Sequence, residues 1–585
     1  MNWARDSGNQ PFQREGNRLT LTPGLWRLSP ARLGGAFAAL MIGLSIVGGI
    51  RNYSAIPYWD MWDSTLNMML RLQNGDTGVW WAQHNEHRII LSRGLFWLDY
   101  TFFDGMSYFL ILANYAFATV AAFFMYLFMK RFDDRRDGWT ANTWALLCFI
   151  VGALFLWTQS DNFTHAFQSE FFLAQLLPLM AFYFLARSAT SSVWWDFAIA
   201  CLLGILSAGT LASGVIVAPL MLAYVLVLRQ GHGRAVILLI TAVVIGVAYF
   251  KGYSKPGGHG SLTDTLLHRP LDAFNYAMMF LGTPFNFLVG GRRLGALVAL
   301  IAGIVFTITS AVLVRRWFFT VEKSPFAAAL LFFIAYIGAS AVATAGGRLA
   351  LGEESVFALR YTTPALMAWA ALLLLLWHRA SFRPATDTRN HVMLFVGLGA
   401  LMLTYQAKAL RNAGETLFPR EVAALALTLD INDEAAIKSV YPVAERARML
   451  SAAARPLGLS FFGQPPYAHL DQALGMAFAV PEAPACLGSL DAAVPVDGAP
   501  AFILVTGWMF DPLTRAAPRL VRFVNDKGLV TGFAMVGKRR QDVAKQTDAR
   551  AEYAGFVGYV QVASAGSTLV ATGQEPRCRI DFRLP

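Results

Sequence analysis

Long stretches without a single charged residue recur along the chain, and they limit its fold more than any other feature does. Examples are residues 33–50, 236–250, 294–314 and 365–377. With its flanking residues, each stretch approaches the roughly 20 apolar positions that a helix needs to cross about 30 Å of hydrocarbon. One such stretch is compatible with a buried helix in a soluble protein. A long series of them indicates a polytopic membrane protein.

The composition agrees with this interpretation and disfavours binding to nucleic acid. Hydrophobic residues make up 56% of the 585 positions and charged residues 15%, against about 45–50% and about 25% in ordinary soluble domains. The net charge of +11 comes from basic residues that are scattered among the apolar stretches and form no continuous stripe. Basic loops beside anionic membrane lipids explain this charge better than a nucleic-acid partner does.

The apolar stretches predict a mostly α-helical bundle of about 11 transmembrane spans. The spans are expected near residues 33–51, 107–129, 141–158, 169–186, 195–210, 213–228, 235–251, 293–314, 326–344, 362–378 and 392–409.

Arginine-rich segments between the spans indicate which side faces the cytoplasm. They lie at residues 5–32, 130–136, 229–234, 315–323 and 379–389, and this threading places all of them on one side. Short basic loops mark the cytoplasmic side of a membrane protein. We therefore expect a cytoplasmic amino terminus and, with an odd number of spans, a carboxyl-terminal region outside.

The predicted threading divides the chain into four parts. They are a cytoplasmic tail (1–32), a transmembrane domain (33–410) with a first outer loop (51–106), an outer helical segment (411–480) and an outer β-rich domain (481–585). In the helical segment, Val422, Leu425 and Leu429 follow a helical spacing. Short alternating runs between turn residues predict a small β-sandwich-like fold for the last part.

Two features of the sequence leave alternatives open. Residues 263–291 are apolar but interrupted by Pro270, Pro284 and several glycines, which favours a re-entrant or interfacial segment on the outer side. If this segment crosses the membrane instead, the carboxyl terminus changes sides. Cys486 and Cys578 flank the β-rich part and are expected to form a disulfide if that part is extracytoplasmic.

The first outer loop opens with two carboxylates among aromatic residues, in the segment from Tyr58 to Asp63. Asp60 and Asp63 are three residues apart and share one face if this segment is helical. Aromatic residues are common at a membrane interface, but carboxylates gain nothing there. We therefore take Asp60 and Asp63 as candidate catalytic residues and Tyr58 as a candidate binding residue.

A second polar cluster lies at residues 83–88 of the same loop and contains His84, Glu86, His87 and Arg88. These side chains are candidates for binding a substrate. His84, His87 and Glu86 also resemble part of a site for a divalent metal, but the sequence has no matched partner motif for them. No cofactor is assigned from the sequence, and a divalent metal stays an alternative.

A third cluster contains Asn162, His165, Gln168 and Glu170, at the end of the third predicted span and the start of the fourth. Polar residues at the depth of the membrane are candidates for function.

A fourth cluster contains Arg348, Arg360 and Tyr361, just before the tenth predicted span. The planar guanidinium of arginine binds phosphate through two hydrogen bonds and keeps its charge. Anchoring of the arginine side chains at the membrane interface is the competing interpretation.

Taken together, these features resemble the GT-C superfamily of membrane glycosyltransferases. The resemblance rests on a cytoplasmic amino terminus, a first span and a long outer loop that opens with Asp60 among aromatics. It also rests on Arg360-Tyr361, followed by Pro364, which is similar to the RY element of many members. One departure is Trp194-Trp195-Asp196, which lies at the start of a span rather than in the soluble domain that carries such a signature in oligosaccharyltransferases.

The resemblance implies an enzyme of the bacterial inner membrane that takes a sugar from a polyprenyl-phosphate donor on the periplasmic side. The acceptor would be a cell-surface glycan or a lipid-linked saccharide. Asp60, or otherwise Asp63, would act as the general base, and Arg360 with Tyr361 would hold the donor phosphate. The β-rich domain would bind glycan through Trp508 or Tyr559, or would serve as a structural cap.

Three other classes of function compete with this one. A transporter or flippase of lipid-linked saccharides predicts internal repeats and charged residues at mid-membrane, and the sequence has no clear repeat. A polymerase or ligase of lipid-linked saccharides uses similar chemistry. A structural membrane protein gives no reason for polar clusters to gather on one side, so their convergence in space favours an enzyme.

Overall fold

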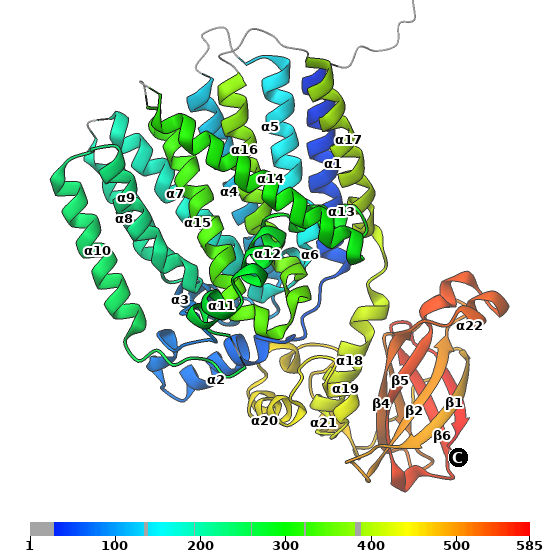
Figure 1. The fold of residues 1–585 in the computed structure, drawn as a ribbon. Coiled ribbons are helices and arrows are strands. Elements are labelled where there is room, and N and C mark those ends of the chain that lie inside the picture. Colours follow the sequence, from blue (N-terminus) through cyan, green and yellow to red (C-terminus); the bar gives the residue numbers. More distant parts are fainter. Residues whose placement is uncertain are drawn as a thin grey trace, which may run out of the picture.

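The computed structural model describes residues 29–133, 139–191, 193–258, 260–320, 323–380 and 388–584. Most of the predicted cytoplasmic tail, and parts of the predicted basic segments 130–136, 315–323 and 379–389, lie outside these residues. The described chain forms a large helix bundle, a smaller helical layer beneath it and a β domain to one side (Figure 1).

Eight helical stretches in the described residues are long and apolar enough to cross a membrane. They are built on α1 (Pro30–Arg51), α4 (Tyr108–Phe132), α5 (Ala141–Leu154), α7 (Ser169–Thr190), α10 (His232–Phe250), α14 (Arg292–Phe318), α15 (Pro325–Arg348) and α16 (Thr362–Ala380). The described residues therefore form the predicted helix bundle, with eight candidate spans in place of the eleven expected.

The three remaining predicted spans differ from these eight for identifiable reasons. α8 (Trp194–Ser207) and α9 (Val217–Val227) are apolar but have only 14 and 11 residues. At about 1.5 Å per residue, neither reaches the roughly 30 Å of a hydrocarbon core. α17 (Thr388–Gln406) begins with polar residues, although it runs alongside α1 (Figure 1).

Successive long helices of the bundle run in opposite directions, so the connecting segments lie at its two ends. The two ends differ because only one of them is covered by further helices. We call the end covered by residues 52–107 and 411–480 the capped end, and the opposite end the open end. α1 and α17 both run from the open end to the capped end (Figure 1). The chain thus enters the bundle at the open end and leaves it at the capped end, as the predicted threading requires.

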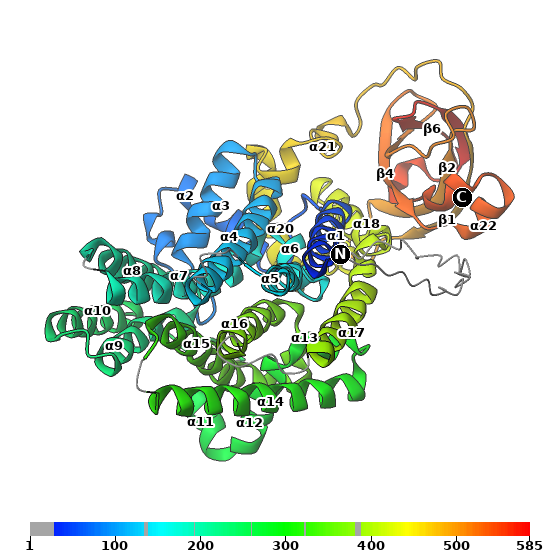
Figure 2. The ribbon, with the colours of Figure 1, turned by 90° about the horizontal axis from the view of Figure 1, so that it is seen from above.

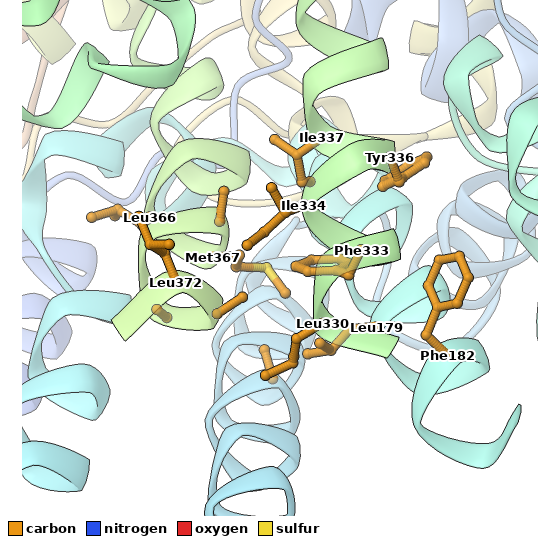
Figure 3. Close-up of a cluster of buried hydrophobic side chains, with 14 of the residues drawn as sticks. Leu179, Phe182, Leu330, Phe333, Ile334, Tyr336, Ile337, Leu366, Met367 and Leu372 are labelled. Atoms are coloured by element: carbon orange, nitrogen blue, oxygen red, sulfur yellow. The ribbon is translucent and has the colours of Figure 1, made fainter. Parts of the chain in front are cut away.

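The core of the bundle lies around α7, which is buried along nearly its whole length. Leu179 and Phe182 on this helix lie among side chains of α15 and α16, including Phe333 and Met367 (Figure 3). α10 differs, because most of its large apolar side chains are exposed at the edge of the bundle (Figure 2). A helix that is apolar all round and exposed requires an apolar solvent, which agrees with a membrane.

Residues 262–288 form three short helices, α11 (Leu262–His268), α12 (Pro270–Leu281) and α13 (Thr283–Leu288). None of them is long enough to cross a membrane, in keeping with the predicted re-entrant or interfacial segment. α12 packs closely against α14 at Gly303, where an added Cβ atom would lie 1.9 Å from the carbonyl oxygen of Met278.

The capped end is covered by two segments that are far apart in the sequence. The first contains η1 (Trp62–Leu66), α2 (Asn67–Gln73), η2 (Thr77–Trp80) and α3 (Ile90–Phe102), and the second contains α18 (Gly414–Thr428), α19 (Glu434–Ile437), α20 (Ala444–Ala454) and α21 (Leu470–Ala473). They share one apolar core that includes Trp62, Phe96, Leu425 and Phe461. The helical segment after residue 410 is therefore part of the same cap as the first loop.

The β domain is a single antiparallel sheet of seven strands in the order β1-β2-β5-β4-β3-β6-β7. The strands are β1 (Leu487–Pro495), β2 (Phe502–Phe510), β3 (Leu520–Val524), β4 (Val530–Lys538), β5 (Gly555–Gln561), β6 (Thr568–Gln574) and β7 (Arg579–Arg583), and α22 (Gln541–Gln546) follows β4. The sheet curls until β1 approaches β7, so the expected β-sandwich of two sheets is wrong. Alternating strands predict buried and exposed faces, but they do not distinguish two stacked sheets from one curled sheet.

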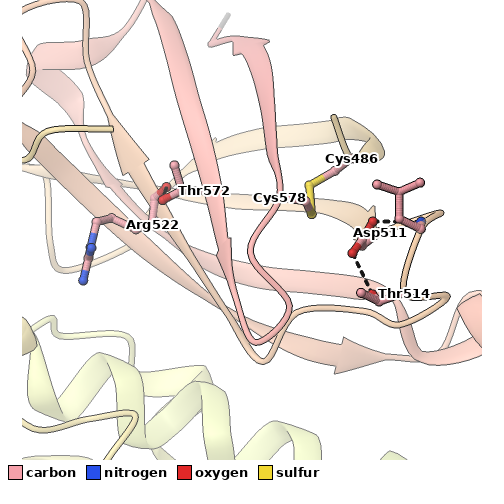
Figure 4. Close-up of a disulfide and its surroundings, with 7 residues drawn as sticks. Cys486, Asp511, Thr514, Arg522, Thr572 and Cys578 are labelled. Atoms are coloured by element: carbon pink, nitrogen blue, oxygen red, sulfur yellow. Dashed lines mark hydrogen bonds between the residues drawn. A yellow bond between two sulfur atoms is a disulfide. The ribbon is translucent and has the colours of Figure 1, made fainter. Parts of the chain in front are cut away.

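A disulfide joins Cys486 and Cys578 beside the closing edge of this sheet (Figure 4). The pairing expected from the sequence is therefore formed. The domain also packs on the cap, because Tyr559 is buried and its hydroxyl donates to the Asp433 carboxylate at 2.8 Å. The expectation that Tyr559 is a surface aromatic is wrong, and its contact is structural.

Candidate functional site

Asp60 lies at the capped end with a side chain that is about half exposed. Its position depends on Trp59, which has a left-handed backbone (φ 50°) and whose N–H donates to the Val440 carbonyl at 2.9 Å. The Asp60 Oδ1 atom lies 4.0 Å from Nε2 of His84. The other ring nitrogen of His84, Nδ1, lies 2.8 Å from the Ser64 hydroxyl. An accessible carboxylate beside an oriented imidazole is a suitable arrangement for moving a proton.

Asp63 has different partners from Asp60, although three residues separate them. Its carboxylate accepts hydrogen bonds from the Tyr441 hydroxyl and from the Arg446 guanidinium, whose Nη2 lies 3.1 Å away. Both partners belong to the second segment of the cap. Asp63 therefore joins the two segments, and this contact favours a structural role for it over the predicted catalytic one.

The polar run 84–88 forms a tight turn, in which His84 and His87 exchange two backbone hydrogen bonds of 2.8 Å. Nδ1 of His87 accepts from the Ala212 N–H at 3.0 Å, so the neutral ring carries its proton on Nε2. That nitrogen lies 3.5 Å from Glu86 Oε1, which also accepts from Arg348 at 2.8 Å. The turn is thereby connected to the end of α15.

Arg88 is buried and donates to three backbone carbonyl oxygens, those of Trp81, Tyr249 and Lys251, at 2.6–2.8 Å. Its guanidinium holds the first loop against the end of α10. Because all three partners are backbone carbonyl oxygens of the protein, they support a positioning role for Arg88 rather than direct contact with a substrate.

The third predicted cluster packs directly against the fourth. Asn162, on the short helix α6 (Ser160–Thr164), donates to the Arg360 carbonyl at 3.0 Å and to the Thr363 hydroxyl at 2.6 Å. Gln168 is buried at the start of α7. Asn162 thus sets the position of the 359–361 turn, where α16 begins.

The guanidinium of Arg360 lies against the ring of Tyr361, with Cζ 5.2 Å from the ring centroid. No carboxylate of the described residues is within 4.0 Å of it, although Asp60 and Asp161 act on it at longer range. Arg348, the other arginine expected to bind phosphate, is instead paired with Glu86. Arg360 therefore has more of its charge available than Arg348 does.

A second guanidinium, that of Arg420 on α18, belongs to the same site. Its Cζ lies 3.7 Å from the centroid of the Tyr58 ring, and the Tyr58 ring lies 5.2 Å from the ring of His165. Among the described residues, no carboxylate is within 4.0 Å of this guanidinium either. Burial lowers the pKa of Arg420, and Tyr58 and Asp161 oppose that effect.

His165 is within electrostatic reach of both arginines, and of Asp161, whose charge opposes theirs. Burial lowers its pKa, so its ring is neutral at pH 7. Burial also lowers the pKa of His84, against the opposing effect of Asp60. Both imidazoles are therefore available as neutral hydrogen-bonding groups rather than as fixed cations.

Glu170 is buried at the first turn of α7, near the centre of these clusters. Four charged groups lie within electrostatic reach of its carboxyl: Asp60, Glu86, Arg93 and Arg360. They come from the first loop, the 84–88 turn, α3 and the start of α16. The four polar clusters of the sequence therefore converge in space at the capped end.

Sequence reasoning overlooked Arg420. It placed Glu170 in the third polar cluster but predicted no specific role for this carboxylate. Arg420 lies in an amphipathic helix about 360 residues after Tyr58, and nothing in its own segment distinguishes it from a surface arginine. Glu170 carried a usable signal, because it is a carboxylate at the start of a strongly apolar helix.

The described residues contain no group of three or more His, Cys, Asp or Glu side chains arranged to hold a metal ion. His84 and His87 point to different partners, and Glu86 is engaged by Arg348. Neither a family model nor a curated protein matches this chain, so the comparisons give these residues no function.

Proposed function

We propose that the protein is a membrane glycosyltransferase that moves a sugar from a polyprenyl-phosphate donor to a glycan or lipid-linked acceptor at the capped end of its bundle. One observation carries this proposal: four distant polar segments converge around an accessible carboxylate, that of Asp60, and two guanidinium groups without a close carboxylate, those of Arg360 and Arg420. A purely structural membrane protein has no use for such a convergence.

In the proposed reaction, the carboxylate acts on the acceptor and the two guanidinium groups act on the donor phosphate. The Asp60 carboxylate takes the proton of an acceptor hydroxyl while the hydroxyl oxygen attacks the anomeric carbon of the donor. The bond between that carbon and the phosphate oxygen breaks, and the phosphate leaves with the electron pair. Arg360 and Arg420 neutralise the charge that develops on the leaving phosphate.

The remaining predicted residues would support this arrangement. Tyr58 and Tyr361 orient the two arginines, and the His84 ring lies beside Asp60. Glu86, His87 and Arg348 connect the 84–88 turn to α15, and Asn162 sets the turn that carries Arg360.

The proposed location is a bacterial inner membrane with the capped end in the periplasm. Several observations support it. Basic residues such as Arg131, Arg229, Arg234 and Arg316 lie at the open end, as expected for the cytoplasmic side. The Cys486–Cys578 disulfide belongs to the capped end, and disulfides persist in oxidising compartments.

Comparison of cell-surface glycans with and without the gene tests this function. The proposal predicts that a particular sugar disappears from a glycan or lipid-linked saccharide when the gene is deleted, and that the wild-type gene restores it. Mass spectrometry of the glycans measures both. An unchanged glycan profile together with unchanged lipid-linked saccharides would contradict the proposal.

Binding of the donor is tested separately at the two arginines. Replacing Arg360 or Arg420 with Ala should weaken the apparent affinity for the donor about 10- to 100-fold, because a hydrogen bond to a charged group contributes about 1.5–3 kcal/mol. Arg293→Ala, at an exposed position near the start of α14, is the control and should leave the affinity unchanged. An unchanged affinity in both site variants would remove the phosphate role.

A further inference from the structure

A cavity of about 1120 Å³ lies at the open end of the bundle, away from the site described above. Its lining residues come from the ends of α7, α9 and α14 and from the starts of α10 and α15. The start of α10 lies on the upper left in Figure 1. The size of the cavity exceeds the roughly 300–1,000 Å³ of most small-molecule sites.

Three cationic side chains line this cavity: Arg229, Arg234 and Lys323. Its described lining residues include no aspartate or glutamate. The carboxylate of Asp196 accepts from the hydroxyl of Ser191, a lining residue, at 3.1 Å, but it is paired with Arg187 at 3.3 Å. The positive charge of the cavity is therefore not compensated by its own walls.

Arg234 is held in a defined orientation at the cavity. Its Nη1 donates to the Ser188 carbonyl at 3.0 Å and to Gln230 Oε1 at 3.1 Å, and its Cζ lies 5.4 Å from the Phe197 ring centroid. The described residues provide no partner for its Nε and Nη2 atoms. The guanidinium is thus fixed through Nη1, while the N–H groups of Nε and Nη2 can still donate hydrogen bonds. Such a planar group is suited to binding a phosphate.

Apolar side chains form the membrane-facing rim of the same cavity. Leu226 and Phe318 line it with 58% and 50% of their surface exposed. Along α10, the apolar exposure continues through Val236 and Ile240. A free phosphate gains nothing from such a surface, whereas the acyl chains of a lipid bury apolar area against it.

We infer that this cavity binds the headgroup of an anionic phospholipid from the leaflet at the open end. The phosphate would lie between Arg229, Arg234 and Lys323, with the acyl chains against α10. Basic pockets between helices on the cytoplasmic side are suited to anionic headgroups. The inference does not depend on the proposed transferase activity, because it rests on other residues at the other end of the bundle.

Native mass spectrometry of the purified protein tests the inference with phosphatidylglycerol as the anionic lipid and phosphatidylcholine as the zwitterionic one. Arg229→Gln with Lys323→Gln removes two of the cations. Neither side chain makes a hydrogen bond or ion pair among the described residues, but the Lys323 ammonium lies 5.2 Å from the Trp317 ring centroid and 5.7 Å from that of Phe318. Circular dichroism of the variant verifies that it folds. Arg315→Gln with Arg316→Gln is the matched control, because these exposed arginines lie at the same end on α14 but outside the cavity.

The wild-type protein should retain phosphatidylglycerol in preference to phosphatidylcholine. The Arg229→Gln, Lys323→Gln variant should lose at least roughly tenfold in affinity for phosphatidylglycerol, while the control variant stays within about twofold of wild type. Equal losses in both variants, or no preference for the anionic lipid, would overturn the inference. So would displacement of the lipid by millimolar inorganic phosphate, which would identify a free anion as the ligand.

Discussion

At the scale of single residues, neighbouring side chains of the same type perform different tasks. Asp60 is half exposed and faces His84, while Asp63 joins the first loop to the second segment of the cap. The resemblance favoured Asp60 over Asp63 as the general base, but no feature of the sequence distinguished the contacts that the two carboxylates make. That distinction depends on Tyr441 and Arg446, which lie almost 400 residues away along the chain.

The contact between Asp63 and Arg446 should stabilise the cap without taking part in catalysis. Both side chains are about one-third exposed, so we expect a coupling free energy of only about 0.5–1 kcal/mol. A double-mutant cycle with Asp63→Asn and Arg446→Gln, measured by unfolding of the detergent-solubilised protein, gives this value. A loss of turnover as large as that of an Asp60 variant would contradict the structural assignment of Asp63.

Asp99 on α3 should make the stability of the cap depend on pH. Its carboxyl is buried and receives one hydrogen bond, from the Ser107 N–H at 3.1 Å, and burial raises its pKa to about 7. The folded state therefore binds a proton more tightly than the unfolded state, whose Asp has a pKa of about 3.9. Stability should fall as pH rises from about 4 to about 7 and level off above that range.

Asp99→Asn should remove this dependence and raise the melting temperature at pH 8, because an amide oxygen still accepts from Ser107 and no charge is buried. Melting curves between pH 5 and pH 8 measure the effect. A remaining slope of the same sign is expected from Glu421 on α18, whose pKa burial also raises to about 7. An Asp99→Asn protein with the wild-type pH profile would contradict this account.

At the scale of elements, apolar composition predicted where most helices lie but not how long each one is. α8 and α9 look like spans in the sequence, yet they end after 14 and 11 residues. The chain turns at Gly209 and Gly214, and the Cβ of any other residue at Gly214 would lie 1.8 Å from the Ser207 carbonyl oxygen. Such a close approach between two segments is a property of their packing, and composition alone does not reveal it.

The packing of α12 on α14 provides a test at this scale. At Gly303 an added Cβ atom would lie 1.9 Å from the Met278 carbonyl oxygen, so Gly303→Ala forces the two backbones apart. We expect a loss of about 1–3 kcal/mol in stability. Gly338→Ala on α15 is the control, because nothing lies within 4 Å of an added Cβ atom there.

Thermal unfolding of the two variants in detergent measures the difference. The Gly303 variant should melt clearly below wild type, and the Gly338 variant should melt at or slightly above it, since alanine favours a helix over glycine. Equal melting temperatures would contradict the close packing of residues 270–288 against α14.

At the scale of the whole molecule, the two ends of the bundle have different chemistry. Cationic side chains surround a cavity at the open end, and the candidate active site lies beneath the cap at the other end. The sequence predicted this sidedness, because basic loops and polar clusters alternate along the chain. It did not predict that residues 411–480 complete the site through Arg420, or that the seven strands form one curled sheet. Both depend on contacts between distant segments.

The central claim is that Asp60 serves as the base of a sugar transfer from a lipid phosphate. Its most direct test is turnover of the purified protein in proteoliposomes, supplied with radiolabelled polyprenyl-phosphate hexoses and a lipid extract that contains the acceptor. Asp76→Asn is the matched control, because Asp76 lies in the same loop, is about as exposed as Asp60 and has local partners, the Arg71 side chain and the Gly78 N–H. Asp60→Asn should lower kcat by about 10²- to 10⁴-fold, and the control should stay within about twofold of wild type. Near wild-type turnover by Asp60→Asn, or no consumption of any donor by the wild-type protein, would contradict the account.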